Sequence, residues 1–165
     1  MVSHTASSEC LTDAEQQAWR GFLRAYAVLV RELDAELEAA HGLPLTSYEV
    51  LARLQNAPSR RMRMRDLADA VLLSRSGLTR LVDRLARDGL LERCSCPNDA
   101  RGAYAVLTDK GARTLEAARP THIAGVRRRF LERLDAAELE QLTEVCERLA
   151  PDAVDAASGD PTTRC

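Results

Sequence analysis

Residues 74–93, which read SRSGLTRLVDRLARDGLLER, decide the fold. Apolar side chains recur there every three or four positions, which predicts a helix from Ser74 to about Asp88 with one buried face. The residues of that face are Leu78, Leu81, Val82 and Leu85. Gly89 follows as a helix-ending residue, and residues 90–94 have the length of a short strand. The other face of the helix is polar and rich in arginine.

The segments on either side complete a recognisable order. Residues 63–71 predict a short helix, after a loop at residues 59–61, and residues 72–74 make a tight turn. Residues 96–102 are dense in turn-forming residues and residues 103–107 predict a second strand, so residues 90–107 predict a β-hairpin. A short helix, a turn, a second helix and a hairpin together are the winged helix-turn-helix.

Long helices flank this unit. Thr12 and Glu15 form a capping-box pattern, which predicts a first helix from Thr12 to about Ala40. The same pattern at Thr46 and Glu49 predicts a second helix that stops before Pro58. After residue 108 a helix runs to about residue 134 with a kink at residue 120, and residues 135–149 form the last helix behind a third capping pattern.

The first helix carries a long apolar stripe. Its members are Trp19, Phe22, Tyr26, Leu29, Leu33 and Leu37. At nearly 30 residues the helix is longer than a small core needs, which favours a partner helix, from this chain or from a second one. A core-facing helix in a monomer is the alternative.

Length and composition narrow the class of protein. A chain of 165 residues, 45% apolar and 29% charged, fits one globular domain and excludes a disordered or low-complexity chain. Apolar runs never exceed six residues, and no signal-peptide core is present, so we expect a cytoplasmic protein without a membrane span. We expect flexible tails at residues 1–10 and 151–165, a helical region at 11–45 and 109–150, and the winged helix-turn-helix at 46–108.

Charge is distributed unevenly along the chain. Residues 53–101 contain eleven arginines and six acidic residues, a net charge of +5, whereas the rest of the chain carries −7. A basic middle segment favours an anionic partner such as nucleic acid. Because 22 of the 23 basic residues are arginine, a compositional bias of the coding DNA is the alternative.

Several motifs, in this order and spacing, resemble the MarR family of transcriptional regulators. They are Arg65-Asp66-Leu67-Ala68-Asp69, residues 74–85, Gly89-Leu90-Leu91-Glu92-Arg93, Asp99-Ala100-Arg101 and Leu107-Thr108-Asp109-Lys110-Gly111. The resemblance covers residues 12–149. It implies that residues 11–45 and 109–150 form a dimerisation region and that residues 46–108 form the DNA-binding domain. It implies a mainly helical homodimer with a small β-hairpin wing, in which two recognition helices enter successive major grooves of a pseudo-palindromic double-stranded DNA site. Repression of transcription is the implied default.

The resemblance also implies which residues contact DNA. Ser74, Arg75, Ser76, Thr79 and Arg80 would face the major groove, where arginine suits guanine and serine or threonine suits phosphate. Arg84 would lie near the phosphates, and Arg93 and Asn98 are plausible phosphate contacts. Arg101 at the wing tip would enter the minor groove, steadied by Asp99. Within the helix, Asp83 is expected to pair with the arginine at position 80 or 87.

Regulation has two candidate routes. The family resemblance implies a small, phenolic or otherwise anionic effector in the crevice between dimerisation helices and DNA-binding domain, for which Trp19, Arg20, Tyr26 and Tyr48 are candidate lining residues. Redox sensing is the alternative, by Cys94 and Cys96 at the base of the wing, where nearby arginines would lower the pKa of a thiol, or by Cys10. If Cys94 and Cys96 share one strand, they point the same way.

The sequence offers little support for a metal site or for enzyme activity. Zinc needs three or four close ligands, and Cys94-x-Cys96 with scattered histidines does not supply them, so we expect neither metal nor cofactor. No nucleophile-elbow, zinc-protease, Walker or dinucleotide-binding motif is present, so we expect no enzyme activity. A helical protein-interaction adaptor is the remaining rival.

Overall fold

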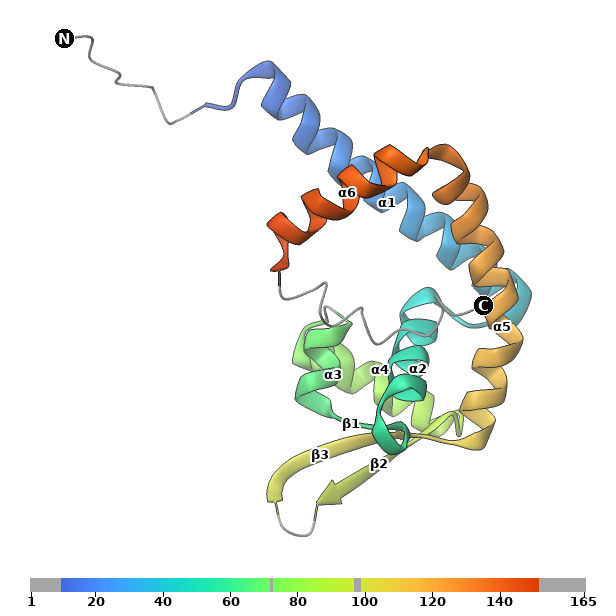
Figure 1. Cartoon of the computed structure of the whole chain (residues 1–165). Coiled ribbons are helices and arrows are strands. Elements are labelled where there is room, and N and C mark those ends of the chain that lie inside the picture. Colours follow the sequence, from blue (N-terminus) through green and yellow to red (C-terminus); the bar gives the residue numbers. More distant parts are fainter. Residues whose placement is uncertain (1–9, 72, 97–98, 152–165) are drawn as a thin grey trace, which may run out of the picture.

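The computed structural model describes residues 10–71, 73–96 and 99–151. The elements are α1 (Asp13–His41), α2 (Leu45–Asn56), η1 (Pro58–Arg60), β1 (Arg61–Arg63), α3 (Met64–Ala70), α4 (Arg75–Arg87), β2 (Leu91–Cys96), β3 (Asp99–Leu107), α5 (Asp109–Arg129), η2 (Leu131–Arg133) and α6 (Ala136–Leu149). Figure 1 shows α1, α5 and α6 arching over a unit made of α2, α3, α4 and the sheet. This is the predicted mainly helical fold with a winged helix-turn-helix. Both chain ends, where tails were predicted, lie almost wholly outside the described residues.

The sheet has a third strand that the sequence analysis missed. β1 pairs antiparallel with β3, and the strand order is β1-β3-β2. The sequence pattern predicts a loop that includes Arg61 and a helix that begins at Arg63, and both assignments are wrong at these two residues. Arginine alternates with methionine over residues 61–64, but so short an alternation does not by itself predict a strand. The strand exists because β3 offers it a hydrogen-bonding edge. Met62, opposite Ala105, faces the core side of the sheet.

The core lies within the winged unit and the first half of α5. Its fully buried members include Leu51 and Leu54 of α2, Leu67 of α3, Leu91 of β2 and Leu115 of α5. The predicted inner face of α4 is confirmed, because Leu78, Val82 and Leu85 are all buried. In α1, by contrast, Leu37 is the one buried residue. The core therefore holds the recognition unit firmly and leaves most of α1 outside it.

Helix ends follow the sequence signals at most positions. The capping boxes at Thr12 and at Asp135 are both formed, and Gly42 and Gly89 take the left-handed conformation expected of helix-ending glycines. The box at Thr46 is wrong, because α2 begins one residue earlier with Pro44 as its N-cap. The amide of Leu45, which has no acceptor within α2, donates instead to Oδ1 of Asp34 in α1, 2.7 Å away. A distant carboxylate thus replaces the local cap.

Helix α5 continues through Pro120 and ends at Arg129, earlier than predicted. Phe130 leaves the helical conformation, and η2 turns the chain towards α6. Two acidic residues of α1, Glu32 and Glu36, pair with Arg129 of α5, and Glu36 also accepts from Arg128. These ion pairs fasten the second half of α1 to α5. None of the described helices combines the length and hydrophobicity that a bilayer crossing needs.

Candidate DNA interface

The first half of α4 presents an open polar face. Ser74 caps the helix, its Oγ accepting from the amide of Gly77 at 3.1 Å. Arg75, Ser76 and Arg80 are exposed, and Thr79 is half-buried with its hydroxyl donating to the carbonyl of Arg75. The predicted groove-facing residues therefore lie together at the end of the helix where the backbone dipole is positive, an arrangement that attracts phosphate.

Asp83 links the recognition helix to the wing. Its Oδ1 accepts from Nη1 of Arg93 in β2 at 2.5 Å. The predicted pairing of Asp83 with an arginine of its own helix is wrong, since Arg87 donates to the Asp83 backbone carbonyl instead. The geometry of the hairpin explains the difference, because β2 returns alongside α4 and brings Arg93 within reach. Arg93, predicted as a phosphate contact, is thus engaged by Asp83.

Arg84 is also engaged within the protein. Its Nη2 donates to Oγ of Ser47 in α2 at 2.8 Å, and Ser47 is fully buried. The guanidinium of the exposed Arg84 is therefore held against α2 by one hydrogen bond.

The wing is an antiparallel hairpin formed by β2 and β3. Leu91 pairs with Leu107 and Cys94 with Tyr104, but the register shifts between Ser95 and Cys96. The side chain of Cys96 lies outside the described part of the chain, so the expectation that Cys94 and Cys96 point the same way stays a prediction. Backbone positions of Asp99 and Arg101 belong to β3, their side chains lie outside the described part of the chain, and Asn98 lies outside it altogether.

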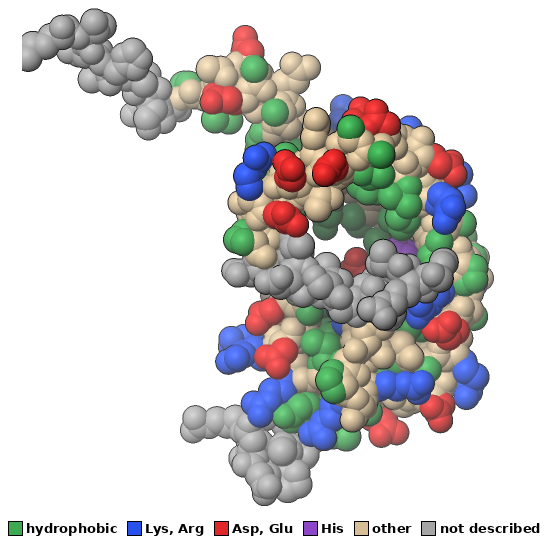
Figure 2. Space-filling model, in the orientation of Figure 1, with side chains coloured by type: hydrophobic (Ala, Val, Ile, Leu, Met, Phe, Trp, Pro, Cys, Tyr) green, Lys and Arg blue, Asp and Glu red, His purple; other side chains and the backbone are tan. Residues whose placement is uncertain are grey.

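The sequence analysis missed a basic cluster on β1. The guanidinium carbon of Arg61 lies 3.9 Å from the ring centre of Tyr104, and Nε of Arg63 donates to the Tyr104 hydroxyl at 2.8 Å. Tyr104 thus holds two arginines on one face of the sheet. The alternation of arginine with methionine over residues 61–64 was the available signal, since it marks a strand with one charged face. Figure 2 shows many Lys and Arg side chains around this lower half of the molecule.

The segment that follows β3 is hydrogen-bonded to the turn at the end of the recognition helix α4. Thr108 caps α5 by accepting from the amide of Gly111, and its hydroxyl contacts the carbonyls of Gly89 and Leu90. Lys110 donates to the carbonyl of Asp88, at the end of α4, at 2.6 Å. The Leu-Thr-x-x-Gly motif therefore holds the start of α5 against the turn between α4 and β2.

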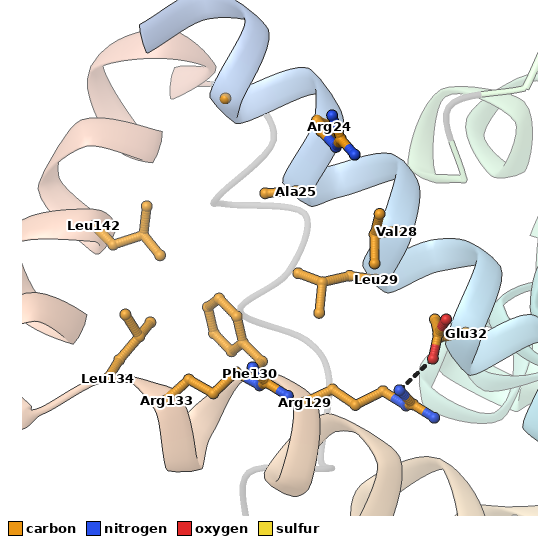
Figure 3. A pocket seen from close by; sticks show the side chains of 11 residues that line it. Arg24, Ala25, Val28, Leu29, Glu32, Arg129, Phe130, Arg133, Leu134 and Leu142 are labelled. Carbon is orange, nitrogen blue, oxygen red and sulfur yellow. Dashed lines mark hydrogen bonds and ion pairs between the residues drawn. The ribbon is translucent and has the colours of Figure 1, made fainter. Parts of the chain in front are cut away.

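The candidate effector residues do not gather at one site. Trp19, Arg20 and Tyr26 are exposed on the first half of α1, where Trp19 stacks on Phe22. Tyr48 is buried in α2, its ring 4.4 Å from that of His122 in α5. None of the four lines the groove of about 710 Å³ between α1, η2 and α6. Figure 3 shows the groove, with Leu29, Phe130 and Leu142 around it.

The cysteines are dispersed. Cys10 is exposed shortly before α1, Cys146 is exposed on α6, and Cys94 is half-buried on β2. No cluster of three metal-binding side chains occurs among the described residues. Redox sensing by Cys94, Cys96 or Cys10 stays a prediction.

Comparison with known proteins identifies the family to which this chain belongs. A profile of the MarR family matches residues 41–102. The structure of Sco3205, a MarR family transcriptional regulator from Streptomyces coelicolor in complex with DNA, superposes with a TM-score of 0.81 at 36% identity, covering 86% of this chain and 92% of that one. The chain belongs to the MarR family.

Curated relatives of this MarR family protein agree. An uncharacterised HTH-type transcriptional regulator of Bacillus subtilis, YkoM, is 32% identical over 112 residues, 68% of this chain and 71% of that protein. The homoprotocatechuate degradative operon repressor of Escherichia coli is 32% identical over 107 residues, 65% of this chain and 70% of that protein. The protein is therefore a DNA-binding transcriptional regulator and not an enzyme.

Proposed function

We propose that this MarR family protein is a homodimeric repressor that reads a pseudo-palindromic operator and releases it when a small effector binds. The observation that carries the proposal is the capped, arginine-rich first half of α4, together with the arginine pair of β1 in the same unit. Arg75 and Arg80 are the proposed base-reading residues, with Ser74, Ser76 and Thr79 beside them. Arg101, steadied by Asp99, is the proposed minor-groove contact, and Asn98 a proposed phosphate contact.

The exposed apolar surface supports a dimer. Trp19, Phe22 and Tyr26 of α1 are 55%, 50% and 60% exposed, and Leu149 of α6 is 68% exposed. Every large exposed apolar side chain of the described residues lies at positions 11–28 or 131–149. Soluble monomers rarely leave so continuous an apolar surface uncovered. A second copy, which carries the same faces, is the occupant that we propose for it.

The groove between α1 and α6 supports the same conclusion. Apolar side chains from α1, from Phe130 and Leu134 on either side of η2, and from α6 lie around it (Figure 3), and it is far larger than a packing defect. Helix α6 has no fully buried residue in the single chain. A partner helix inserted here would supply the missing packing for both helices.

An effector site at the junction of the two regions is the finer part of the proposal. Tyr48 belongs to the DNA-binding unit and His122 to α5, and their rings are in contact. A ligand that separated these rings would move α5 relative to α2. The Escherichia coli relative represses a degradative operon, which supports an aromatic anion as the first effector class to test.

The deciding experiment measures binding of the purified protein to labelled fragments of its own promoter region and to a scrambled fragment. Fluorescence anisotropy at two salt concentrations should show specific binding that weakens steeply as salt rises. Sedimentation of the complex should give two chains per operator. Hydroxybenzoates are then titrated onto the complex. Equal binding to operator and scrambled DNA would contradict sequence-specific regulation, and one chain per operator would contradict the dimer.

A further inference from the structure

Arg84 differs from the arginines at the start of the recognition helix because a buried group holds it. Its Nη2 lies 2.8 Å from Oγ of Ser47, which is 0% exposed and belongs to α2. Arg84 is exposed, as Arg75 and Arg80 of the same helix are, so its bond to a buried hydroxyl and not its burial sets it apart. The bond between Arg84 and Ser47 therefore connects two helices inside the DNA-binding unit.

The neighbour of Ser47 extends this connection to α5. Tyr48 is the next residue of α2, is 3% exposed, and lies with its ring centre 4.4 Å from that of His122. The first turn of α2 thus touches α5 through Tyr48 and α4 through Ser47. A displacement of α5 would reach the recognition helix through two adjacent residues of one rigid helical turn.

The bond is not readily given up when DNA binds. A buried hydroxyl that loses its partner is left as an unsatisfied polar group, and the cost is at least as large as the stabilisation that one exposed ion pair supplies. The charge of the guanidinium also makes this hydrogen bond stronger than one between neutral groups. Arg84 is therefore better used in holding α4 than in binding phosphate.

We propose that Arg84 is a positioning residue: its bond to Ser47 sets the angle of the recognition helix against α2 and, through Tyr48 and His122, connects that helix to α5. The inference rests on the proposed DNA-binding function. It assigns a role in operator recognition to Ser47, a residue that cannot touch DNA.

The test is Ser47→Ala, which removes the hydroxyl with almost no change in volume and keeps a good helix former. Binding to operator and scrambled DNA is measured by anisotropy over a range of salt. Ser47→Ala and Arg84→Ala should each weaken operator binding about tenfold, the order expected for a hydrogen bond to a charged group. Scrambled-DNA affinity and the salt slope should stay as in the wild type, and the double variant should lose no more than Arg84→Ala alone.

A different pattern of affinities would contradict the proposal. If Ser47→Ala binds like the wild type while Arg84→Ala weakens both DNAs alike and lowers the salt slope by about one, Arg84 is a phosphate contact. Arg87→Ala, an exposed residue of the same helix bonded to the carbonyl of Asp83, serves as the matched control. Circular dichroism confirms that each variant is folded. Absence of specific binding by the wild type would instead overturn the proposed function, and this inference with it.

Discussion

Gly111 offers the sharpest test of how the wing is fastened. A Cβ added at this position would lie 2.0 Å from the carbonyl oxygen of Leu90 and 2.7 Å from Cδ1 of Leu107. The first of these contacts is with backbone, which cannot rotate away as a side chain can. Gly111→Ala must therefore push the start of α5 away from the turn that joins α4 to β2.

The expected change in the free energy of unfolding is the sum of one stabilising and two destabilising effects. Alanine in place of glycine gains about 1 kcal/mol in helix propensity. Overpacking costs about 1–3 kcal/mol, and more where backbone must move. The displacement also weakens the hydrogen bond that the Thr108 hydroxyl shares between the carbonyls of Gly89 and Leu90, worth about 1 kcal/mol in all because the hydroxyl has a single hydrogen to donate. We expect a net destabilisation of about 2 kcal/mol, or roughly 4–8 °C in Tm for a chain of this size.

Thermal and urea unfolding followed by circular dichroism, at one fixed protein concentration, measure this change. Ala117→Gly at an exposed position of the same helix is the control, and it should show the ordinary loss of about 1 kcal/mol. A Gly111→Ala protein as stable as the wild type, or more stable, would refute the argument that the motif glycine is required by close approach.

Three further predictions concern the ion pairs, the dimer and the DNA. The guanidinium groups of Arg129 and Arg128 hold the pKa of Glu36 below its ordinary value of 4.5. The ionised carboxylate therefore adds to the free energy of unfolding above pH 4.5, and this stabilisation is lost as the pH falls through the lowered pKa. Glu36→Gln should accordingly be less stable than the wild type in urea at neutral pH, with a difference that disappears in strong acid; a difference of equal size in acid would contradict this origin. Phe22→Glu should give a single-chain mass in sedimentation velocity while Gln17→Glu keeps the dimer, because Phe22 lies on the uncovered apolar face; an intact Phe22→Glu dimer would place the interface elsewhere. Arg80→Ala should lose about 1–3 kcal/mol of operator binding and relax specificity, whereas Arg113→Ala on α5 should not, and unchanged anisotropy curves for both Arg80→Ala and Arg75→Ala would remove them from the base-reading face.

The fold was predictable from sequence where a pattern is local. The spacing of Leu78, Val82 and Leu85 indicated the inner face of α4, and capping residues indicated the start of α1 and α6. Prediction failed where the partner is distant in the chain. Asp34 rather than Thr46 satisfies the start of α2, and β1 exists because β3 pairs with it.

The candidate site divides in the same way. The polar face of α4 follows from helical periodicity, so Arg75 and Arg80 could be placed in advance. The engagement of Arg93 by Asp83 and of Arg84 by Ser47 depends on how β2 and α2 pack against α4, which no spacing within one helix reveals. The Tyr104 cluster needed the register of β1 on β3.

Trp19 can serve as a fluorescent probe of the uncovered face of α1. It is the chain's single tryptophan and is 55% exposed in the isolated chain. Its fluorescence thus reports on one surface without any attached dye. Emission from the separated chain should resemble that of indole in water, and it should move to shorter wavelength as that surface is covered. Dilution of the unlabelled protein in a fluorimeter then becomes a titration of self-association.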